Sequence, residues 1–194
     1  MKIIKLALWK VPLTSHATYY MADGKCCDTV ESIVLRIETD SELCGWGEVC
    51  PIPHYLPAYA NGVKPSIEEL ASVLLGADPI GPDALMQRLN NYLPGHFYTK
   101  SIIDTALWDL TAKAAGLPLY KLLGGRQSEI LPLYHSITCI EPAEMARIAA
   151  QAQQQGICQF QVKLGSDNNW QADVERLIRV RETVGKGPLV YGDW

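Results

Sequence analysis

The order of apolar and polar positions predicts a small mixed domain in the first part of the chain. Residues 2–12 and 29–39 alternate between apolar and polar side chains, as β-strands with one buried face do. Turn residues then lead into a third strand at 43–49, which predicts an antiparallel hairpin. Helical spacing of apolar residues follows at 66–75, 83–92 and 100–115. The pattern predicts an α+β domain.

Local signals refine this picture at three places. Ser66 and Glu69 have the spacing of a capping box, which predicts that a helix begins at Ser66. Residues 16–25 and 51–62 are rich in polar, aromatic or proline residues and are predicted to be long loops. Loops of that length are often functional.

The pattern changes after Arg126. Strands and helices now alternate, which is typical of a parallel sheet with right-handed crossovers. We therefore predict one domain at 1–126 and a second at 127–194. The expected strands and helices of the second domain are 131–137, 142–155, 157–164, 170–184 and 188–193.

Two of these strands end in side chains with complementary chemistry. Lys163 ends one strand and Asp193 ends the next, and Gln161 precedes Lys163 by two positions. The carboxyl ends of parallel strands open on one edge of the sheet, where α/β folds build their sites. A lysine can act as a general base and a carboxylate can bind Mg²⁺. The alternatives are a solvated lysine at a strand end and a carboxylate that starts a loop or caps a helix.

Composition excludes several classes of protein. The 194 residues are 48% apolar and 20% charged, which favours a packed core over disorder. A net charge of −4 without a basic stripe argues against nucleic acid as a partner. We expect no membrane span and no signal peptide. The six cysteines form no CxxC pair, so we expect free thiols in the cytoplasm.

Three segments show a resemblance to a known family. They are the Ala106–Leu110 helix with Lys113, the Gly116–Gly125 linker, and the Phe160–Gly165 strand. With these segments the whole chain resembles the mandelate racemase and muconate-lactonising branch of the enolase superfamily. Enzymes of this superfamily use a Lys or His base and Mg²⁺ to stabilise an ene-diolate.

The resemblance implies an N-terminal α+β capping domain followed by the first part of a (β/α)7β barrel, of which three strands are present. It implies that Lys163 is the second lysine of the KxK strand and that Asp193 is the first of three carboxylate ligands of Mg²⁺. Gln161 stands where many members carry the first lysine, so we expect it to contact the substrate through its amide. The other metal ligands and the opposing acid/base would lie outside residues 1–194.

Three further stretches are residues 53–60, Gly95-His96 with Tyr98, and 160–163. With them the chain resembles the subgroup that acts on proline derivatives. Tyr55 would lie over the substrate ring, where an aromatic face attracts a cationic nitrogen. An equally good interpretation of Tyr55 is a packing aromatic in a proline-rich loop. His54, Tyr19 and Tyr20 are weaker candidates for substrate contact.

These features together predict a Mg²⁺-dependent lyase that removes the α-proton of a proline-type amino acid through an ene-diolate. The expected reaction is dehydration of cis-3-hydroxy-L-proline. One alternative is epimerisation of 4-hydroxyproline betaine or proline betaine. A second is a non-catalytic fragment that needs the rest of the barrel, and we expect residues 1–194 alone to be inactive. We also expect a homo-oligomer, because the last strand leaves an unpaired sheet edge.

Overall fold

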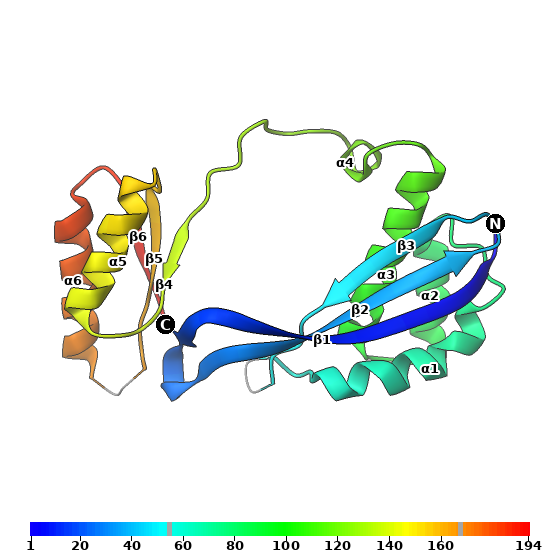
Figure 1. Cartoon of the computed structure of the whole chain (residues 1–194), viewed down its shortest axis with the longest axis horizontal. Coiled ribbons are helices and arrows are strands. Elements are labelled where there is room, and N and C mark those ends of the chain that lie inside the picture. Colours follow the sequence, from blue (N-terminus) through cyan, green and yellow to red (C-terminus); the bar gives the residue numbers. More distant parts are fainter. Residues whose placement is uncertain (54–55, 167–168) are drawn as a thin grey trace. The chain divides into compact units, whose positions relative to one another are not determined.

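The chain folds into two compact units. The first consists of Met1–Thr14 and Thr29–Gln127, and the second of Ser15–Asp28 and Ser128–Trp194. Each unit has its own sheet covered by helices (Figure 1). The second unit thus combines residues 128–194 with a segment from early in the chain. The computed structural model describes residues 1–53, 56–166 and 169–194.

The sheet of the first unit has the order β1-β2-β3, formed by β1 (Ile3–Tyr20), β2 (Cys26–Thr39) and β3 (Cys44–Val49). Strands β2 and β3 are antiparallel, with partners from Ile33↔Val49 to Glu38↔Cys44. The predicted hairpin is therefore present. Alternate residues of β2 are buried under the helices, as its period of two requires.

Three helices cover this sheet, namely α1 (Val63–Leu74), α2 (Pro82–Tyr92) and α3 (Phe97–Ala114). A short helix, α4 (Leu119–Leu122), follows. Apolar side chains of helices and sheet form one continuous core. Its fully buried members include Leu35, Ile37, Leu70, Leu74, Leu89, Ile102, Ile103, Leu107 and Leu110.

The capping-box prediction was wrong about where α1 begins. The helix starts at Val63, three residues before Ser66. Pro65 fits in the first turn because the amides there have no intrahelical acceptor. The Ser66 hydroxyl instead donates to the Gly62 carbonyl at 2.8 Å and lies 3.0 Å from Nδ1 of His96. Ser66 therefore lies inside the first turn and links α1 to the start of α3.

Strand β3 and helix α3 approach each other very closely (Figure 1). The approach is made possible by two glycines that have no side chain on the helix-facing side of the strand. A Cβ at Gly45 would lie 2.1 Å from the Ala106 carbonyl oxygen, and one at Gly47 would lie 2.0 Å from that of Ile102. The backbone of the strand therefore packs directly on the backbone of the helix.

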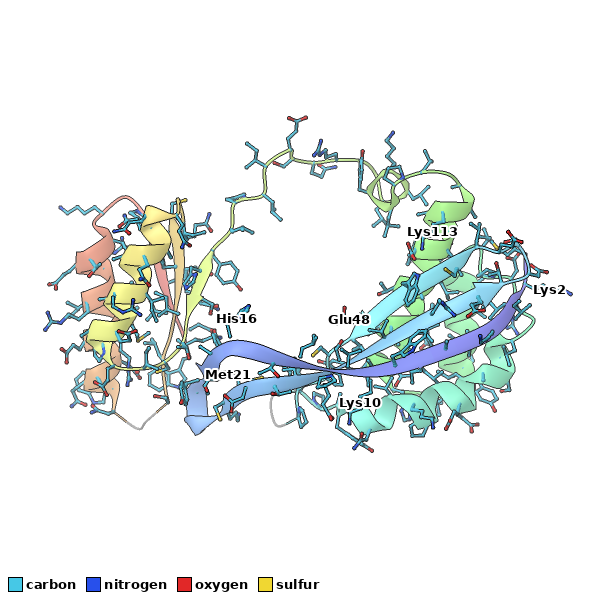
Figure 2. All side chains as sticks on the ribbon, viewed as in Figure 1. Lys2, Lys10, His16, Met21, Glu48 and Lys113 are labelled. Atoms are coloured by element: carbon cyan, nitrogen blue, oxygen red, sulfur yellow. The ribbon has the colours of Figure 1, made fainter. Side chains whose placement is uncertain are left out.

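Polar contacts fix the same interface at its edge. The Asp109 carboxylate accepts from the Trp46 amide at 2.8 Å and from the Lys113 ammonium at 2.6 Å. Lys113 reaches from α3 (Figure 2) and donates to the Cys44 carbonyl at 2.9 Å. The Asp109 and Lys113 side chains that carried part of the family resemblance thus join helix α3 to strand β3.

Asp109→Ala is expected to lower the free energy of unfolding by about 1 to 2 kcal/mol, because a charge-assisted hydrogen bond to the Trp46 amide is lost. The Lys113 ion pair adds little to this figure, since both side chains are at least one-third exposed. Urea unfolding followed by circular dichroism measures the change.

Glu68→Ala is the matched control, since Lys64 and Glu68 form an exposed i,i+4 pair 3.5 Å apart. It should change stability by less than about 0.5 kcal/mol. Equal losses in the two variants would contradict a specific role for Asp109.

The second unit confirms the predicted alternation of strands and helices. It contains β4 (His135–Ile137), α5 (Pro142–Gln154), β5 (Gln159–Lys163), α6 (Trp170–Val184) and β6 (Leu189–Asp193). The strands are parallel in the order β4-β5-β6. A separate core joins helices and sheet, formed by Ile137, Met145, Ala149, Ala152, Phe160, Val162, Leu164, Val180 and Val184.

Strand β4 is shorter than predicted. Residues 131–134 lie outside any strand, and Leu131 and Leu133 are exposed. The pairing register explains the difference: His135 is opposite Phe160, and β5 begins only one residue earlier, at Gln159. Leu131–Leu133 therefore have no β5 residue as a partner in this register.

The first half of the predicted loop at 16–25 is strand. Strand β1 continues to Tyr20 and β2 begins at Cys26, with a 3-10 turn at Ala22–Gly24 between them. Residues 15–28, including His16 and Met21 (Figure 2), group with the second unit, and we call them the hairpin tip. Their backbone groups pair with that unit, which a local sequence pattern does not reveal.

All six cysteines are free thiols, as predicted. In the described parts of the chain, no helix is both long and apolar enough to cross a membrane.

Candidate active site

The two faces of strand β5 have different surroundings. Phe160 and Val162 are fully buried in the core formed with the helices, whereas Gln161 and Lys163 alternate with them on the other face. The parallel register places Gln161 opposite Tyr191 and Lys163 opposite Asp193. Side chains from two strand ends are therefore neighbours on the face that the helices do not cover.

The three predicted polar side chains meet on this face. The Lys163 ammonium forms an ion pair with Oδ2 of Asp193. The Gln161 amide nitrogen donates to the same oxygen at 2.9 Å. The Lys163 side chain is 15% exposed and that of Asp193 is 37% exposed, so this cluster is partly shielded while its carboxylate remains accessible.

The Gln161 side chain, which is expected to contact the substrate, contacts a neighbouring carboxylate in the structure. Its amide nitrogen is bonded to the Asp193 carboxylate. A glutamine here can hold the carboxylate without adding positive charge, whereas a lysine at this position would add one. Contact between Gln161 and a substrate stays a prediction. Tyr55 and His54 lie outside the described residues, so the role predicted for Tyr55 also stays a prediction.

A fourth side chain on this face comes from the hairpin tip. The Tyr19 hydroxyl is hydrogen-bonded to the Ser136 hydroxyl, and Ser136 is opposite Gln161 in the β4–β5 register. Sequence reasoning gave Tyr19 only as a weak candidate and missed Ser136. Ser136 could be found only from its pairing with Gln161, and that pairing is known only once the register of β4 and β5 is known.

The donor chemistry fits magnesium as far as this chain extends. Mg²⁺ prefers hard oxygen ligands and commonly binds one or two carboxylates together with water and substrate oxygens. Asp193 offers such a carboxylate at a strand end. No group of three or more His, Cys, Asp or Glu residues in the described parts of the chain could hold a metal ion by itself. Asp193 would therefore be one ligand of a set completed by other groups.

Comparison with known proteins shows relatives along the whole chain. The chain is 37% identical over 195 residues to a cis-3-hydroxy-L-proline dehydratase of Roseibium aggregatum, covering 100% of this chain and 53% of the relative. It is 30% identical to an N-succinyl-L-Arg/Lys racemase of Bacillus cereus, covering 100% and 52% respectively. The chain thus spans about half the length of the curated relatives it matches, which include both dehydratases and epimerases.

Solved structures agree with this result. The crystal structure of the B. cereus racemase superposes with a TM-score of 0.94 at 28% identity, over 100% of this chain and 52% of that one. A member of the enolase superfamily from Roseovarius nubinhibens, complexed with magnesium, superposes with a TM-score of 0.88 at 35% identity, over 99% and 52%.

The family model named "Mandelate racemase / muconate lactonizing enzyme, N-terminal domain" matches residues 3–124. This match and the superpositions confirm the predicted α+β capping domain, and the strands after it agree with the first part of a barrel. The chain therefore belongs to the mandelate racemase / muconate lactonizing enzyme family of the enolase superfamily.

Proposed function

We propose that this chain is part of a magnesium-dependent enzyme that removes the α-proton of a proline-type amino acid. The observation that supports this most directly is the meeting of Lys163 and Asp193 at adjacent strand ends on the face not covered by helices. The dehydratase relative of R. aggregatum and the magnesium complex of the R. nubinhibens relative support the substrate class and the metal.

In this proposal Lys163 is the base on one face of the substrate. Its position in the last pair of the β5–β6 ladder limits its movement, and its shielding keeps water from competing for the proton. Gln161 donates to the Asp193 carboxylate beside Lys163 and so holds the oxygen that would bind magnesium. Bound magnesium would supply positive charge that offsets the negative charge developing on the substrate carboxylate.

We further propose dehydration of cis-3-hydroxy-L-proline as the reaction. Lys163, or a base on the opposite face, takes the α-proton, the electrons of that C–H bond form a Cα=Cβ bond, and the C–O bond at C3 breaks. The hydroxyl group leaves with a proton as water. Epimerisation is the second candidate, because named relatives include racemases and epimerases; there a proton returns to the opposite face of the same carbon.

Proton NMR in D₂O distinguishes these reactions. The protein expressed from the complete reading frame is incubated with Mg²⁺ and cis-3-hydroxy-L-proline, with proline betaine and 4-hydroxyproline betaine, or with N-succinyl-L-arginine. Loss of both the α-proton and the C3 carbinol signal of cis-3-hydroxy-L-proline supports dehydration. Exchange of the α-proton without loss of the carbinol signal supports epimerisation. Turnover confined to N-succinyl-L-arginine would overturn the assignment to proline derivatives.

Residues 1–194 alone are expected to show no turnover of these compounds, because one carboxylate and one lysine do not complete a metal site with bases on two faces. The same NMR assay measures this, with the complete protein as the positive control. Turnover by the shorter chain would show that the missing groups are not required. No turnover by either chain, under conditions that support metal binding, would favour a non-catalytic role.

A further inference from the structure

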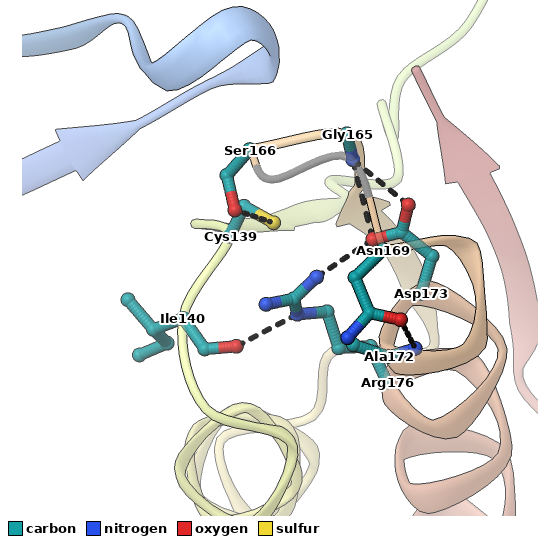
Figure 3. A network of polar contacts seen from close by, with 8 residues as sticks. All are labelled: Cys139, Ile140, Gly165, Ser166, Asn169, Ala172, Asp173 and Arg176. Carbon is teal, nitrogen blue, oxygen red and sulfur yellow. Dashed lines mark hydrogen bonds and ion pairs between the residues drawn. The ribbon is translucent and has the colours of Figure 1, made fainter.

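A buried ion pair in α6 lies beneath the loops at the strand ends (Figure 3). Asp173 and Arg176 are one helical turn apart, and Nη1 of Arg176 lies 2.7 Å from Oδ1 of Asp173. Their side chains are only 4% and 6% exposed. Ion pairs are seldom buried unless both groups find further partners, because removing charges from water is costly.

Each member of the pair binds the backbone of a different loop. Both carboxylate oxygens of Asp173 accept from the Gly165 amide at 3.2 Å, in the loop after β5. Nε of Arg176 donates to the Ile140 carbonyl at 2.9 Å, in the loop after β4. The pair therefore ties two loops that are 25 residues apart in the chain to a single point of α6.

The hairpin tip is hydrogen-bonded to these same two loops. The Gly165 carbonyl, on the residue whose amide binds Asp173, accepts from the Asp23 amide at 2.8 Å. Next to Ile140, the Cys139 amide donates to the Tyr20 carbonyl at 3.2 Å. The Thr138 hydroxyl accepts from the Tyr20 amide at 2.5 Å. Each loop thus binds α6 on one side and the hairpin tip on the other.

We propose that Asp173 and Arg176 are positioning residues for the candidate site. By holding the two loops at a fixed separation they maintain the surface to which the hairpin tip binds, and so they keep Tyr19 beside Ser136 on the face that carries Gln161 and Lys163. The consequence for catalysis rests on the proposed function, whereas the consequence for the hairpin tip does not.

Hydrogen exchange in the full-length protein tests the structural part directly. In Arg176→Met, the amides of Asp23 and Cys139 are expected to exchange about tenfold faster than in the wild type. The reason is that both hydrogen bonds join the hairpin tip to the loops after β4 and β5, and these loops lose their anchor on α6. Core amides of β5 should change less than twofold. Arg179→Met is the matched control: Arg179 lies on the same helix in an exposed pair with Glu175 at 3.5 Å. It should leave all these amides unchanged.

Conservative variants keep the test decisive if Arg176→Met fails to fold. Asp173→Asn retains an oxygen that can accept from the Gly165 amide, and Arg176→Lys retains the charge. Both should give intermediate exchange at Asp23 and Cys139. Folded variants that exchange these amides within twofold of the wild type would overturn the proposal, and so would an equal acceleration across the β5 core.

A double-mutant cycle tests the link to the site. Tyr19→Phe removes the hydroxyl that contacts Ser136. If the pair acts through Tyr19, Arg176→Met should change kcat/KM by a smaller factor in the Tyr19→Phe background than in the wild type. Multiplicative effects would show that the pair does not act through Tyr19. Should the enzyme turn over a different substrate, the cycle is run on that substrate, and the exchange result stands independently.

Discussion

Lys163→Ala in the complete protein is expected to reduce exchange of the substrate α-proton with D₂O by about 10²- to 10⁴-fold, the usual contribution of a positioned general base. The physical reason is that the β5–β6 ladder fixes the backbone of Lys163 at this strand end and Asp193 holds its ammonium, so the substitution removes a base whose position is fixed. NMR of the α-proton signal measures the rate. If a second base serves the other face, exchange should be lost only for the enantiomer whose proton points toward Lys163.

Two controls separate a lost base from a damaged protein. Lys186→Ala removes an exposed lysine that precedes the amino end of β6, whereas Asp193 ends that strand, so it should leave exchange unchanged. Lys163→Ala itself should retain its circular dichroism spectrum and bind Mg²⁺, because Gln161 still donates to Asp193. Exchange at the wild-type rate in Lys163→Ala would remove Lys163 from the mechanism.

The strand ends that carry this prediction could be found from the sequence because their pattern is local. Apolar residues at Phe160 and Val162 alternate with polar ones at Gln161 and Lys163, and a period of two assigns them to opposite faces. The helix at Trp170–Val184 was found with both ends correct, since Asn169 caps it and Gly185 follows it. Parallel pairing then followed from the alternation of strands and helices.

Features set by distant parts of the chain could not be predicted in this way. Residues 16–20 form a strand although their pattern suggested a loop, and Tyr20 pairs with Cys139, far away in the sequence. The short β4 depends on where β5 begins, which its own sequence does not encode. Tertiary contacts override local propensity in both cases.

Within the candidate site, the sequence predicted which residues share a face but not which atoms touch. The contact of Gln161 with Asp193 depends on the lateral register of two strands, and a shift of one residue would place these side chains on opposite faces. Ser136 was missed because nothing in its own neighbourhood marks it as special. Its importance comes from lying opposite Gln161 and beside Tyr19.

Gly47→Ala is expected to destabilise the first unit by about 3 kcal/mol or more, at the upper end of the cost of overpacking. The added methyl group would lie 2.0 Å from the Ile102 carbonyl oxygen. That oxygen belongs to the backbone of α3, so it cannot move aside as a flexible side chain would. Helix and strand must separate, which opens the core that they share. Urea unfolding followed by circular dichroism measures the loss.

The matched control for this prediction is Gly187→Ala, since a Cβ at Gly187 would meet nothing within 4 Å and its φ is not positive. That variant should stay within about 1 kcal/mol of the wild type, and a small gain is expected because alanine restricts the unfolded chain. The contrast isolates the close approach of β3 and α3 from the general effect of replacing glycine. Equal stability of the two variants would mean that the helix does not pack directly on the strand backbone at Gly47.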